Sequence, residues 1–432
     1  MHHLIINKLG PIDHCELSLK QYTILTGYQA SGKSTIAKAI YFFRTIKDDI
    51  YQIIQRNKYS QIIYMQGYAQ SNEFEDTASL RGDIESYIRT KFLNIFGSSY
   101  SMNPEMQIAY SYNDDTYIKV TLKYGKDSIT PNYVWVSYSN NIRTFMSSNA
   151  DYDNTEILKD QLSKLFNDPY ETVYIPAGRS ILTVLGSQFS YLYSTMDDAQ
   201  KRLLDGCTRD YLERVMRLRP QFSGGLEGLL EGIPLSNRDK NTYIYILNLI
   251  QNILKGKYAV NDGEERIWVD NNHYVKMNFA SSGQQEVVWI VNLLFYYFTL
   301  QEKVYFIIEE PESNLFPESQ NLVTELIILI SNFGNSVLVT THSPYVLGSI
   351  NNMLYAGSLA KINSQKVCQI IPKFSWIDPE HFSAFFVKEG GAESCVDEDL
   401  IQIDNSLLDE ISHTINNTYD ALFNVELDNK EE

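Results

Sequence analysis

Cysteine is scarce in this sequence, and its few cysteines are not arranged in pairs. The four among its 432 residues, Cys15, Cys207, Cys368 and Cys395, lie far apart and form no CxxC motif. Structural zinc sites and disulfide frameworks both need matched cysteine spacings, so neither is expected here. Scattered free cysteines are typical of a reducing compartment, and we therefore expect a cytoplasmic protein.

Long apolar runs are missing as well. The most apolar stretch, residues 287–300, contains Asn292 and is shorter than the roughly 20 residues that a membrane-spanning helix needs. Residues 1–9 lack the basic and apolar segments of a signal peptide. No heptad run is long enough for an extended coiled coil, and no internal repeat stands out. The sequence therefore predicts a globular chain that does not contact a membrane.

Positive charge is in deficit: Lys and Arg number 36 and Asp and Glu number 53, which gives a formal net charge of −17. An acidic surface repels the phosphate backbone of nucleic acids, so bulk charge disfavours DNA as a partner but leaves room for a local basic patch. Apolar material is plentiful, because 44% of the residues are hydrophobic. At this length we expect two or three subdomains with a large buried core.

The apolar pattern along the chain predicts alternating groups of strands and helices. Six short strands are expected in the first third of the chain, the last three as an antiparallel meander: residues 4–8, 15–19, 22–26, 106–112, 116–124 and 132–138. Residues 48–97 and 197–255 are predicted to be mostly helical, and residues 172–176 to form a strand. Residues 401–425 are predicted to form a docking helix, followed by an acidic end.

The first motif with a chemical meaning follows the third predicted strand and opens a predicted helix. It fits the pattern GxxxxGK[ST] and consists of Gly27, Tyr28, Gln29, Ala30, Ser31, Gly32, Lys33 and Ser34, followed by Thr35. Glycines let backbone N–H groups wrap around phosphate oxygens, and the helix adds the positive end of its dipole. In this pattern Lys33 reaches the β- and γ-phosphates and Ser34 is a ligand of Mg²⁺. The alternative, a chance glycine-rich turn, is disfavoured by the flanking strand and helix.

The second motif is a pair of glutamates at the end of the apolar run at residues 304–308. A run of this kind suits a strand buried on both faces of a parallel sheet. Because side chains alternate along a strand, Glu309 and Glu310 point to opposite sides and are expected to have different roles. Glu309 would hold Mg²⁺, and Glu310 would orient or deprotonate the attacking water. The alternative is a solvated acidic turn.

Two further motifs flank this pair. Another apolar strand, residues 337–341, ends at His342, and a single predicted helix at residues 320–332 connects it to the glutamates as in a βαβ unit. His342 is therefore expected to reach the γ-phosphate. Residues 280–286 place a Ser-Gly pair at the start of an apolar helix, which is either a second anion site or a plain helix N-cap.

These four motifs, in this order, resemble those of the ABC-type ATPases, specifically the non-transporter branch that contains SMC, RecF and OLD-like proteins. By this resemblance residues 27–35 are a Walker A loop, residues 281–285 a signature motif, residues 307–311 Walker B, residues 312–315 a D-loop, and His342 the switch histidine. The resemblance implies binding of ATP and Mg²⁺, with Glu310 and His342 as catalytic residues.

The sequence departs from the pattern of that branch in three places. Walker B ends Glu309-Glu310 where Asp-Glu is usual, so Mg²⁺ would sit differently or bind through water. The signature reads SSGQQ instead of LSGGQ. The place of the Q-loop glutamine is taken by residues 174–180, which contain no glutamine. Arg179 is a candidate sensor of the γ-phosphate there, and an ordinary salt bridge is the alternative.

The resemblance implies a two-lobed α/β head with a P-loop parallel sheet, an antiparallel β meander and a helical arm. We expect five segments: an N-terminal ATPase lobe with Walker A, the meander, a strand and helical arm, a C-terminal ATPase lobe with the other motifs, and a strand and helix extension. Their expected bounds are residues 1–100, 101–150, 151–260, 261–360 and 361–432.

The resemblance also implies how such a head works. Two heads sandwich ATP, and the signature residues of each act in trans on the nucleotide of the other; here these are Ser281, Ser282, Gly283 and Gln284. One hypothesis is an ATP-hydrolysing dimer or higher oligomer that regulates an effector such as a toxin or nuclease, as in bacterial anti-phage defence. The other is a RecF- or SMC-like ATPase that clamps DNA in repair or recombination, which the acidic charge disfavours.

Overall fold

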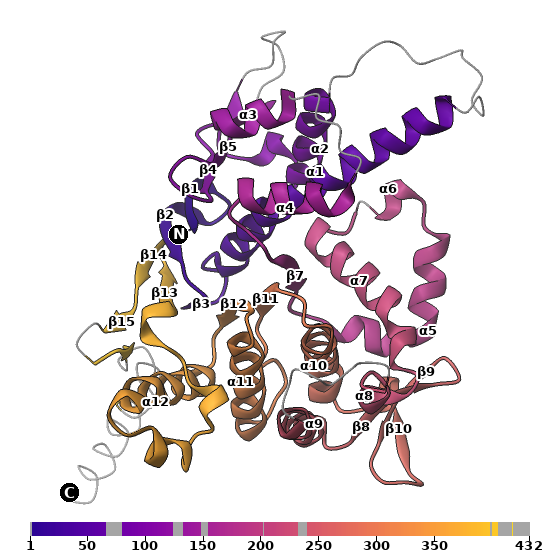
Figure 1. Cartoon of the computed structure of the whole chain (residues 1–432), viewed down its shortest axis with the longest axis vertical. Helices are drawn as coiled ribbons and strands as arrows, with labels where there is room; N and C mark the ends of the chain where they lie inside the picture. The colour runs from indigo at the N-terminus through magenta and orange to yellow at the C-terminus, as the bar shows by residue number, and fades with distance from the viewer. Residues whose placement is uncertain are drawn as a thin grey trace, which may run out of the picture.

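The computed structural model shows two groups of elements that meet at a central sheet (Figure 1). The N-terminal strands and helices lie at one end of the molecule, and the helices that follow residue 240 lie at the other. The structure describes residues 2–65, 80–123, 133–147, 154–201, 203–231, 240–397, 400–404 and 417. Within these ranges, no helix is both long enough and apolar enough to cross a membrane.

The first sheet is antiparallel and has the strand order β2-β1-β4-β5-β6. Its strands are β1 (His2–Leu9), β2 (Ile12–Leu19), β4 (Gln107–Ser111), β5 (Tyr117–Lys123) and β6 (Tyr133–Tyr138). Buried and exposed residues alternate along β5, as expected for a sheet with one face on the core. The predicted meander is confirmed, and the structure joins it to β1, which pairs with β4.

Helices pack with this sheet in one hydrophobic core. They are α1 (Lys33–Met65), α2 (Leu80–Phe96), α3 (Asn140–Ser147) and α4 (Thr155–Leu165), with a short 3-10 turn η1 (Ser99–Ser101). The apolar residues Ile36, Ile40 and Phe43, which recur at helical spacing, are fully buried. This stripe fixes the first turns of α1 against the core, and with them the position of Lys33.

The central sheet has the strand order β14-β13-β3-β12-β11-β7. Its strands are β3 (Tyr22–Gly27), β7 (Glu171–Ile175), β11 (Val304–Glu309), β12 (Ser336–Thr341), β13 (Phe382–Lys388) and β14 (Gly391–Ser394). From β13 to β7 all neighbours pair in parallel. Every residue of β3, β11 and β12 is buried, and for β11 this confirms the prediction of a strand covered on both faces.

The two faces of this sheet belong to two different cores. Tyr305 and Ile307 of β11 face the core that contains α1, whereas Phe306 and Ile308 face a second core. The second core includes α9 (Lys240–Leu254), α10 (Ser282–Leu300), α11 (Pro317–Asn332) and α12 (Pro344–Cys368), together with residues of the helical arm. Because successive side chains of β11 point to opposite faces, both halves of the molecule pack against the same sheet.

The helical arm extends from the end of β7 and packs beside α10 (Figure 1). Its elements are α5 (Ser180–Thr195), α6 (Asp198–Lys201), α7 (Gly206–Leu218), η2 (Arg219–Phe222) and α8 (Gly225–Gly228), and the small sheet β8 (Lys257–Asn261), β9 (Glu264–Trp268) and β10 (Tyr274–Lys276) follows α9. The prediction that residues 197–255 are mostly helical is confirmed by α6, α7, α8 and α9. Strand-like patterns in the sequence at residues 265–269 and 273–279 correspond to β9 and β10, whereas β8 was not predicted. A 3-10 turn, η3 (Met277–Phe279), leads into α10.

The C-terminal part of the described chain returns to the central sheet. After α12 come η4 (Lys373–Ser375), η5 (Pro379–His381), β13 and β14, and then the short strands β15 (Val396–Asp397) and β16 (Gln402–Ile403). β13 pairs with β3, so a strand from the predicted extension neighbours the strand that carries the phosphate loop. Of the predicted docking helix, residues 405–416 and 418–425 lie outside the described residues. The five-segment division of the chain stays a prediction.

Candidate functional site

Sheet topology brings three of the predicted motifs to one edge. β3, β12 and β11 are neighbours and run parallel, so their carboxyl ends lie side by side. The loop at residues 27–32 follows β3, His342 follows β12, and Glu309 and Glu310 stand at the end of β11. β7, on the far side of β11, adds residues 176–179 to the same edge. Loops at the carboxyl ends of parallel strands are where α/β proteins bind ligands.

Two positions of the phosphate loop, Gly27 and Gly32, have backbone conformations and surroundings that favour glycine. Gly27 has φ +140°, and a Cβ there would lie 2.2 Å from the carbonyl oxygen of Val387 in β13. Gly32 has φ +110°, and a Cβ there would lie 2.4 Å from Cδ1 of Ile12. Both positions therefore exclude a side chain by conformation and by space. Ala30 also has positive φ, at 59°, so the loop is tightly wound.

Lys33 is the buried cation of this loop. Its Nζ donates hydrogen bonds to the carbonyl oxygens of Gly27 and Tyr28, at 3.0 Å and 2.7 Å. Burial lowers the pKa of Lys33 to about 8, although the nearby carboxylates of Glu310, Glu312 and Glu309 act to raise it. The ammonium is thus held in the loop by carbonyl dipoles, in a place where a phosphate would add strong favourable charge.

The other loop residues surround this cation. Tyr28, Gln29, Ala30 and Ser34 are exposed, whereas Ser31 and Thr35 are half-buried. The Oγ atom of Ser31 is buried and has no hydrogen-bond partner among the described residues. Ser34 lies in the first turn of α1, where its hydroxyl is open to solvent. The exposed side chains of Gln29 and Ser34 therefore present polar groups at the surface of the loop.

The two glutamates at the end of β11 occupy different environments, as predicted. Glu309 is 4% exposed; its Oε2 accepts a hydrogen bond from the backbone N–H of Ala177 at 3.3 Å, and its buried Oε1 has no partner among the described residues. The Glu310 side chain is 38% exposed, and its backbone has φ +43°. A non-glycine residue in this conformation costs roughly 1–2 kcal/mol. The backbone N–H of Glu310 donates to the carbonyl of Thr340 at 2.9 Å, which helps to hold it there.

His342 bridges the glutamate and the lysine. Its Nε2 lies 3.5 Å from Oε1 of Glu310, and its Nδ1 lies 3.5 Å from Nζ of Lys33. An ammonium is a donor only, so Nδ1 acts as the acceptor and Nε2 carries the proton in this arrangement. The structure thus links three predicted site residues from three strand ends.

Glu312 is a residue whose part in this site the sequence did not reveal. Its Oε1 accepts hydrogen bonds from the backbone N–H of His342 at 2.8 Å and from Oγ1 of Thr341 at 2.7 Å. The Glu312 carboxylate therefore holds the backbone of His342 in place. The motif Pro311-Glu312 next to Glu310 was visible in the sequence, but it gave no sign of a partner on the next strand.

The predicted signature motif forms a capped helix start. Ser281 is the N-cap of α10, and Ser281 and Gln284 form a reciprocal capping box. The N-cap alternative is thus present, with the Gln284 side chain used within its own chain. Gly283 is buried, and a Cβ there would lie 2.6 Å from the carbonyl oxygen of Asn314 in the predicted D-loop. Ser282 is exposed at the helix start.

Arg179 is not placed as a sensor of a phosphate. Its side chain is fully buried, and its guanidinium donates hydrogen bonds to backbone carbonyls and forms an ion pair with Glu286. Burial lowers the pKa of Arg179 against the opposing effect of nearby acidic groups. Of the two roles that the sequence left open, the geometry therefore favours the salt bridge and not the sensor.

Comparison with known protein families decides the identity of this fold. The family model of the AAA ATPase domain matches residues 1–347. The chain belongs to the AAA ATPase domain family. The matched range contains the phosphate loop, the capped start of α10, the two glutamates and His342, so an ATPase domain with nucleotide-binding capacity accounts for the shared edge of the sheet.

Solved structures offer more distant likenesses to this ATPase. An Smc head bound to the C-winged helix domain of ScpA has a TM-score of 0.41 at 12% identity over 91% of this chain and 95% of that chain. A Pyrococcus furiosus Smc head with an extended coiled coil, bound to the C-terminal domain of ScpA, has a TM-score of 0.36 at 11% identity, over 91% of this chain and 96% of that chain. The Thermotoga maritima SMC head has a TM-score of 0.33 at 12% identity, over 80% of this chain and 90% of that chain. No curated protein matches.

The residues at the ATPase site fit a magnesium ion. Mg²⁺ prefers oxygen ligands and is usually held by one or two protein groups together with substrate phosphates. The unpaired Oε1 of Glu309 and the exposed hydroxyl of Ser34 provide such a set. Within the described part of the ATPase, no cluster of three or more His, Cys, Asp or Glu residues is arranged to hold a metal. The donor set therefore suits a metal that arrives with the nucleotide.

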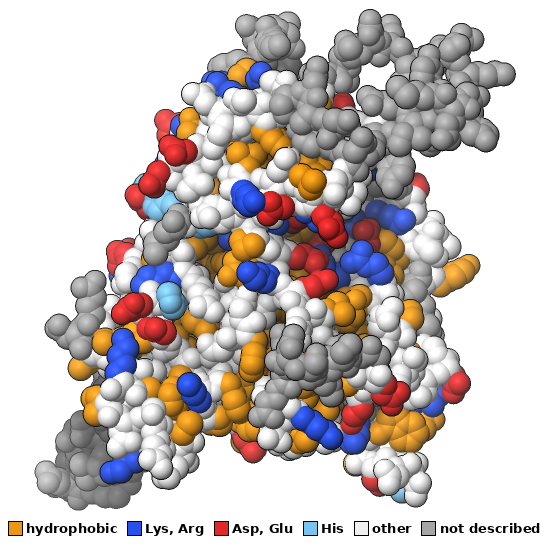
Figure 2. Space-filling view, viewed as in Figure 1, with side chains coloured by type: hydrophobic (Ala, Val, Ile, Leu, Met, Phe, Trp, Pro, Cys, Tyr) orange, Lys and Arg blue, Asp and Glu red, His pale blue; other side chains and the backbone are white. Residues whose placement is uncertain are grey.

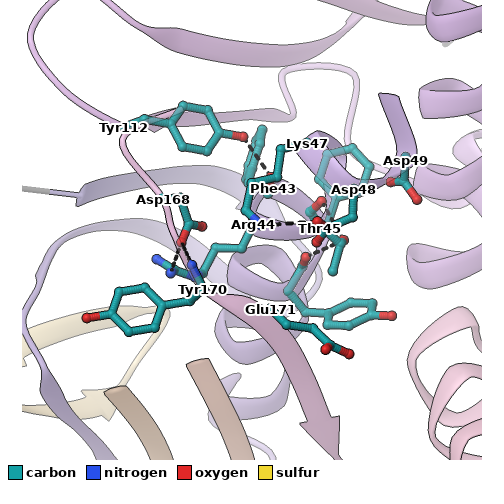
Figure 3. Close-up of polar contacts among 12 residues, drawn as sticks. Phe43, Arg44, Thr45, Lys47, Asp48, Asp49, Tyr112, Asp168, Tyr170 and Glu171 are labelled. Carbon is teal, nitrogen blue, oxygen red and sulfur yellow. Dashed lines mark hydrogen bonds and ion pairs between the residues drawn. The ribbon is translucent and has the colours of Figure 1, made fainter. Parts of the chain in front are cut away.

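A separate cavity of about 740 Å³ lies at the opposite edge of the ATPase sheet, near the amino ends of β7 and β11. α1, α2, α4 and α7 line it with both cations and carboxylates, and Figure 2 shows charged side chains gathered there. Figure 3 shows Asp48 and Asp49 of its α1 wall, and also Arg44 of α1, which does not line the cavity and donates to Asp168 at 2.7 Å. The mixed charge favours neither anions nor cations, and none of the predicted site residues lines the cavity.

Proposed function

We propose that this protein hydrolyses ATP with Mg²⁺ and uses ATP to hold two copies together as a clamp or scaffold that regulates an effector protein. The observation that carries the proposal is the contact chain from Lys33 through His342 to Glu310, with 3.5 Å at each step. These residues come from the ends of three neighbouring parallel strands. A phosphate-binding cation, a polar imidazole and a half-exposed carboxylate at one edge are the groups that phosphoryl transfer to water requires.

Each residue has a role that follows from its surroundings. Lys33 and the loop N–H groups bind the phosphates, and Glu310, with solvent access, accepts a proton from the attacking water. His342 contacts Glu310 through Nε2 and lies next to Lys33, so its one N–H can exchange the contact with Glu310 for a hydrogen bond to the γ-phosphate or to the water. Bound Mg²⁺ would neutralise developing phosphate charge, with Ser34 and Glu309 as its protein ligands.

The dimer is supported by the exposed position of Ser282 at the start of α10. The orphan N–H groups of a helix start attract anions, and the γ-phosphate held by a second copy is the anion that the proposal supplies. The signature residues would then act in trans. The bacterial anti-phage setting and a toxin or nuclease as the effector rest on the sequence resemblance. DNA clamping is the alternative function, and the net charge of −17 disfavours it.

Glu310→Gln tests the catalytic part of the proposal. The amide has nearly the same shape but cannot accept a proton, so we expect ATP binding to be kept and turnover to fall by about 100-fold or more. In light scattering, this variant should be a monomer without nucleotide and a dimer with ATP and Mg²⁺. Glu318→Gln, in the first turn of α11, is the matched control and should behave like the wild type.

Two results would contradict the proposal. Wild-type turnover by Glu310→Gln would show that this carboxylate is not the base. A Glu310→Gln protein that binds ATP but stays monomeric would rule out the ATP-dependent dimer and leave the hydrolysis proposal standing.

A further inference from the structure

Arg179 stands between the two parts of the site that the proposed function uses. Four of its N–H groups donate to main-chain carbonyls: Nη1 to Pro176 at 2.7 Å and to Glu309 at 2.6 Å, Nη2 to Glu310 at 3.0 Å, and Nε to Glu286 at 3.0 Å. The side chain has no solvent exposure. The guanidinium therefore holds both peptide groups that flank the α-carbon of Glu310.

The other end of this connection is Glu286 in the second turn of α10. Its carboxylate accepts from the backbone N–H of Arg179 at 3.1 Å and from that of Ser180 at 3.3 Å, and it forms the ion pair with the guanidinium. Glu286 is 4% exposed and lies in the helix that Ser281 caps. One buried ion pair thus connects the start of α10 to the backbone of Glu310.

We infer that Arg179 is a positioning residue that couples the start of α10 to Glu310, so that contact of α10 with a second copy sets the catalytic carboxylate. The inference rests on the proposed function, because it assigns a regulator to the same hydrolytic site. The backbone of Glu310, at φ +43°, is held on both sides: its own N–H donates to Thr340, and its carbonyl accepts from Arg179 and from the N–H of Ser313. A shift of α10 would therefore pass through Glu286 and Arg179 directly to that strained residue.

The chemistry of arginine suits this task and that of lysine does not. A guanidinium spreads five donors over a rigid plane, which lets one group reach carbonyls from β11, the loop after β7 and α10 together. An ammonium has the same charge but places all its donors on one atom. Arg179→Lys should therefore keep the ion pair with Glu286 and lose most of the hold on the carbonyls of Pro176, Glu309 and Glu310.

The test compares Arg179→Lys with Arg44→Lys. Arg44 is a matched control because it is also buried and ion-paired, with Asp168, but lies at the amino edge of the sheet and over the ring of Tyr305. We expect both variants to lose thermal stability. Arg179→Lys alone should lower kcat by roughly 10- to 100-fold, because a small displacement of a catalytic group has effects of this size. Its affinity for ATP should stay within about threefold of the wild type.

The dimer supplies a readout that a general loss of stability would not produce. With slow hydrolysis, Arg179→Lys should accumulate the ATP-bound dimer in light scattering, as Glu310→Gln does. A variant that was only destabilised would show less dimer. Wild-type kcat for folded Arg179→Lys, or an equal fall in kcat for Arg44→Lys, would overturn the inference.

Glu286→Gln provides a second variant if Arg179→Lys fails to fold. The amide keeps the size of the side chain but can accept only one of the two N–H groups and loses the ion pair, so the same selective fall in kcat is expected. Normal turnover by Glu286→Gln would overturn the coupling. If the wild type hydrolyses ATP and Glu310→Gln does not, such a result would refute the coupling alone. If the wild type does not hydrolyse ATP, the proposed function itself fails.

Discussion

At the scale of the single residue, the candidate site combines a buried lysine with a strained glutamate. Lys33 is held by the carbonyls of its own loop, and Glu310 adopts a positive φ that its neighbours support. Both features cost free energy in a protein that is only marginally stable, and such costs are concentrated at functional sites. The lysine in particular has a protonation state that a bound phosphate would change.

The lowered pKa of Lys33 predicts how ATP binding depends on pH. The free protein loses the Lys33 proton as the pH rises through about 8, and bound phosphate favours the charged form. ATP affinity should therefore be constant below pH 8 and fall by up to about tenfold per pH unit above it. Calorimetric titrations between pH 7 and 9.5 measure this. Lys33→Arg, which stays charged, should bind with little pH dependence; a similar fall for that variant would assign the effect to another group.

At the scale of the element, α10 connects the two halves of the proposed mechanism. Its capped start presents exposed Ser282, while buried Gly283 packs on the carbonyl of Asn314 in the loop after Glu310. Substitution of Gly283 would disturb that loop in the same chain. Ser282 is thus the position at which a trans contact can be changed without a clash in its own chain.

Mixing two inactive variants tests whether α10 acts in trans. Lys33→Ala removes the loop cation, and Ser282→Asp places a carboxylate where the partner's γ-phosphate would lie, so each homodimer should be inactive. In a heterodimer one site carries both changes and the other carries neither, so about half of the wild-type activity per heterodimer should return if the sites are independent. Ser282→Ala, which adds no charge, is the control. Full activity of Ser282→Asp alone would exclude the trans contact.

At the scale of the whole molecule, the site depends on strands from distant parts of the chain. β7, β11, β12 and β3 form its edge, and β13 packs Val387 against Gly27. The N-terminal core lies on one face of this sheet and the core of α10 and α11 on the other. A nucleotide bound at this edge would therefore lie on a sheet that both cores share, which suits the clamp or scaffold that we propose.

The acidic charge of the whole chain makes a prediction about DNA. With a net charge of −17, the protein alone should bind duplex DNA only weakly at physiological salt. A gel-shift assay with and without ATP checks this, and the salt dependence separates a local basic patch from specific contacts. Sub-micromolar, ATP-dependent binding would favour the DNA-clamping alternative over regulation of an effector.

Much of the site was predictable from sequence because its residues follow buried strands. Residues 27–35, Glu309, Glu310 and His342 each come directly after an apolar strand, and local patterns of this kind identify both the strand and its carboxyl end. The same patterns predicted the meander and the burial of β11 on both faces. The N-cap and the anion site at Ser281 stayed alternatives, since the same residues satisfy both.

Only the tertiary structure decided the parts that depend on contacts between distant residues. Arg179 lies 107 positions from Glu286 and 130 from Glu309, so no local pattern could show whether it faces a phosphate or the backbone. Glu312 follows β11 but holds the backbone of His342, which follows β12, and Gly27 contacts Val387 of β13 from a distant part of the chain. Periodicity records which face of an element is buried, but the partner on that face is set by how the elements pack.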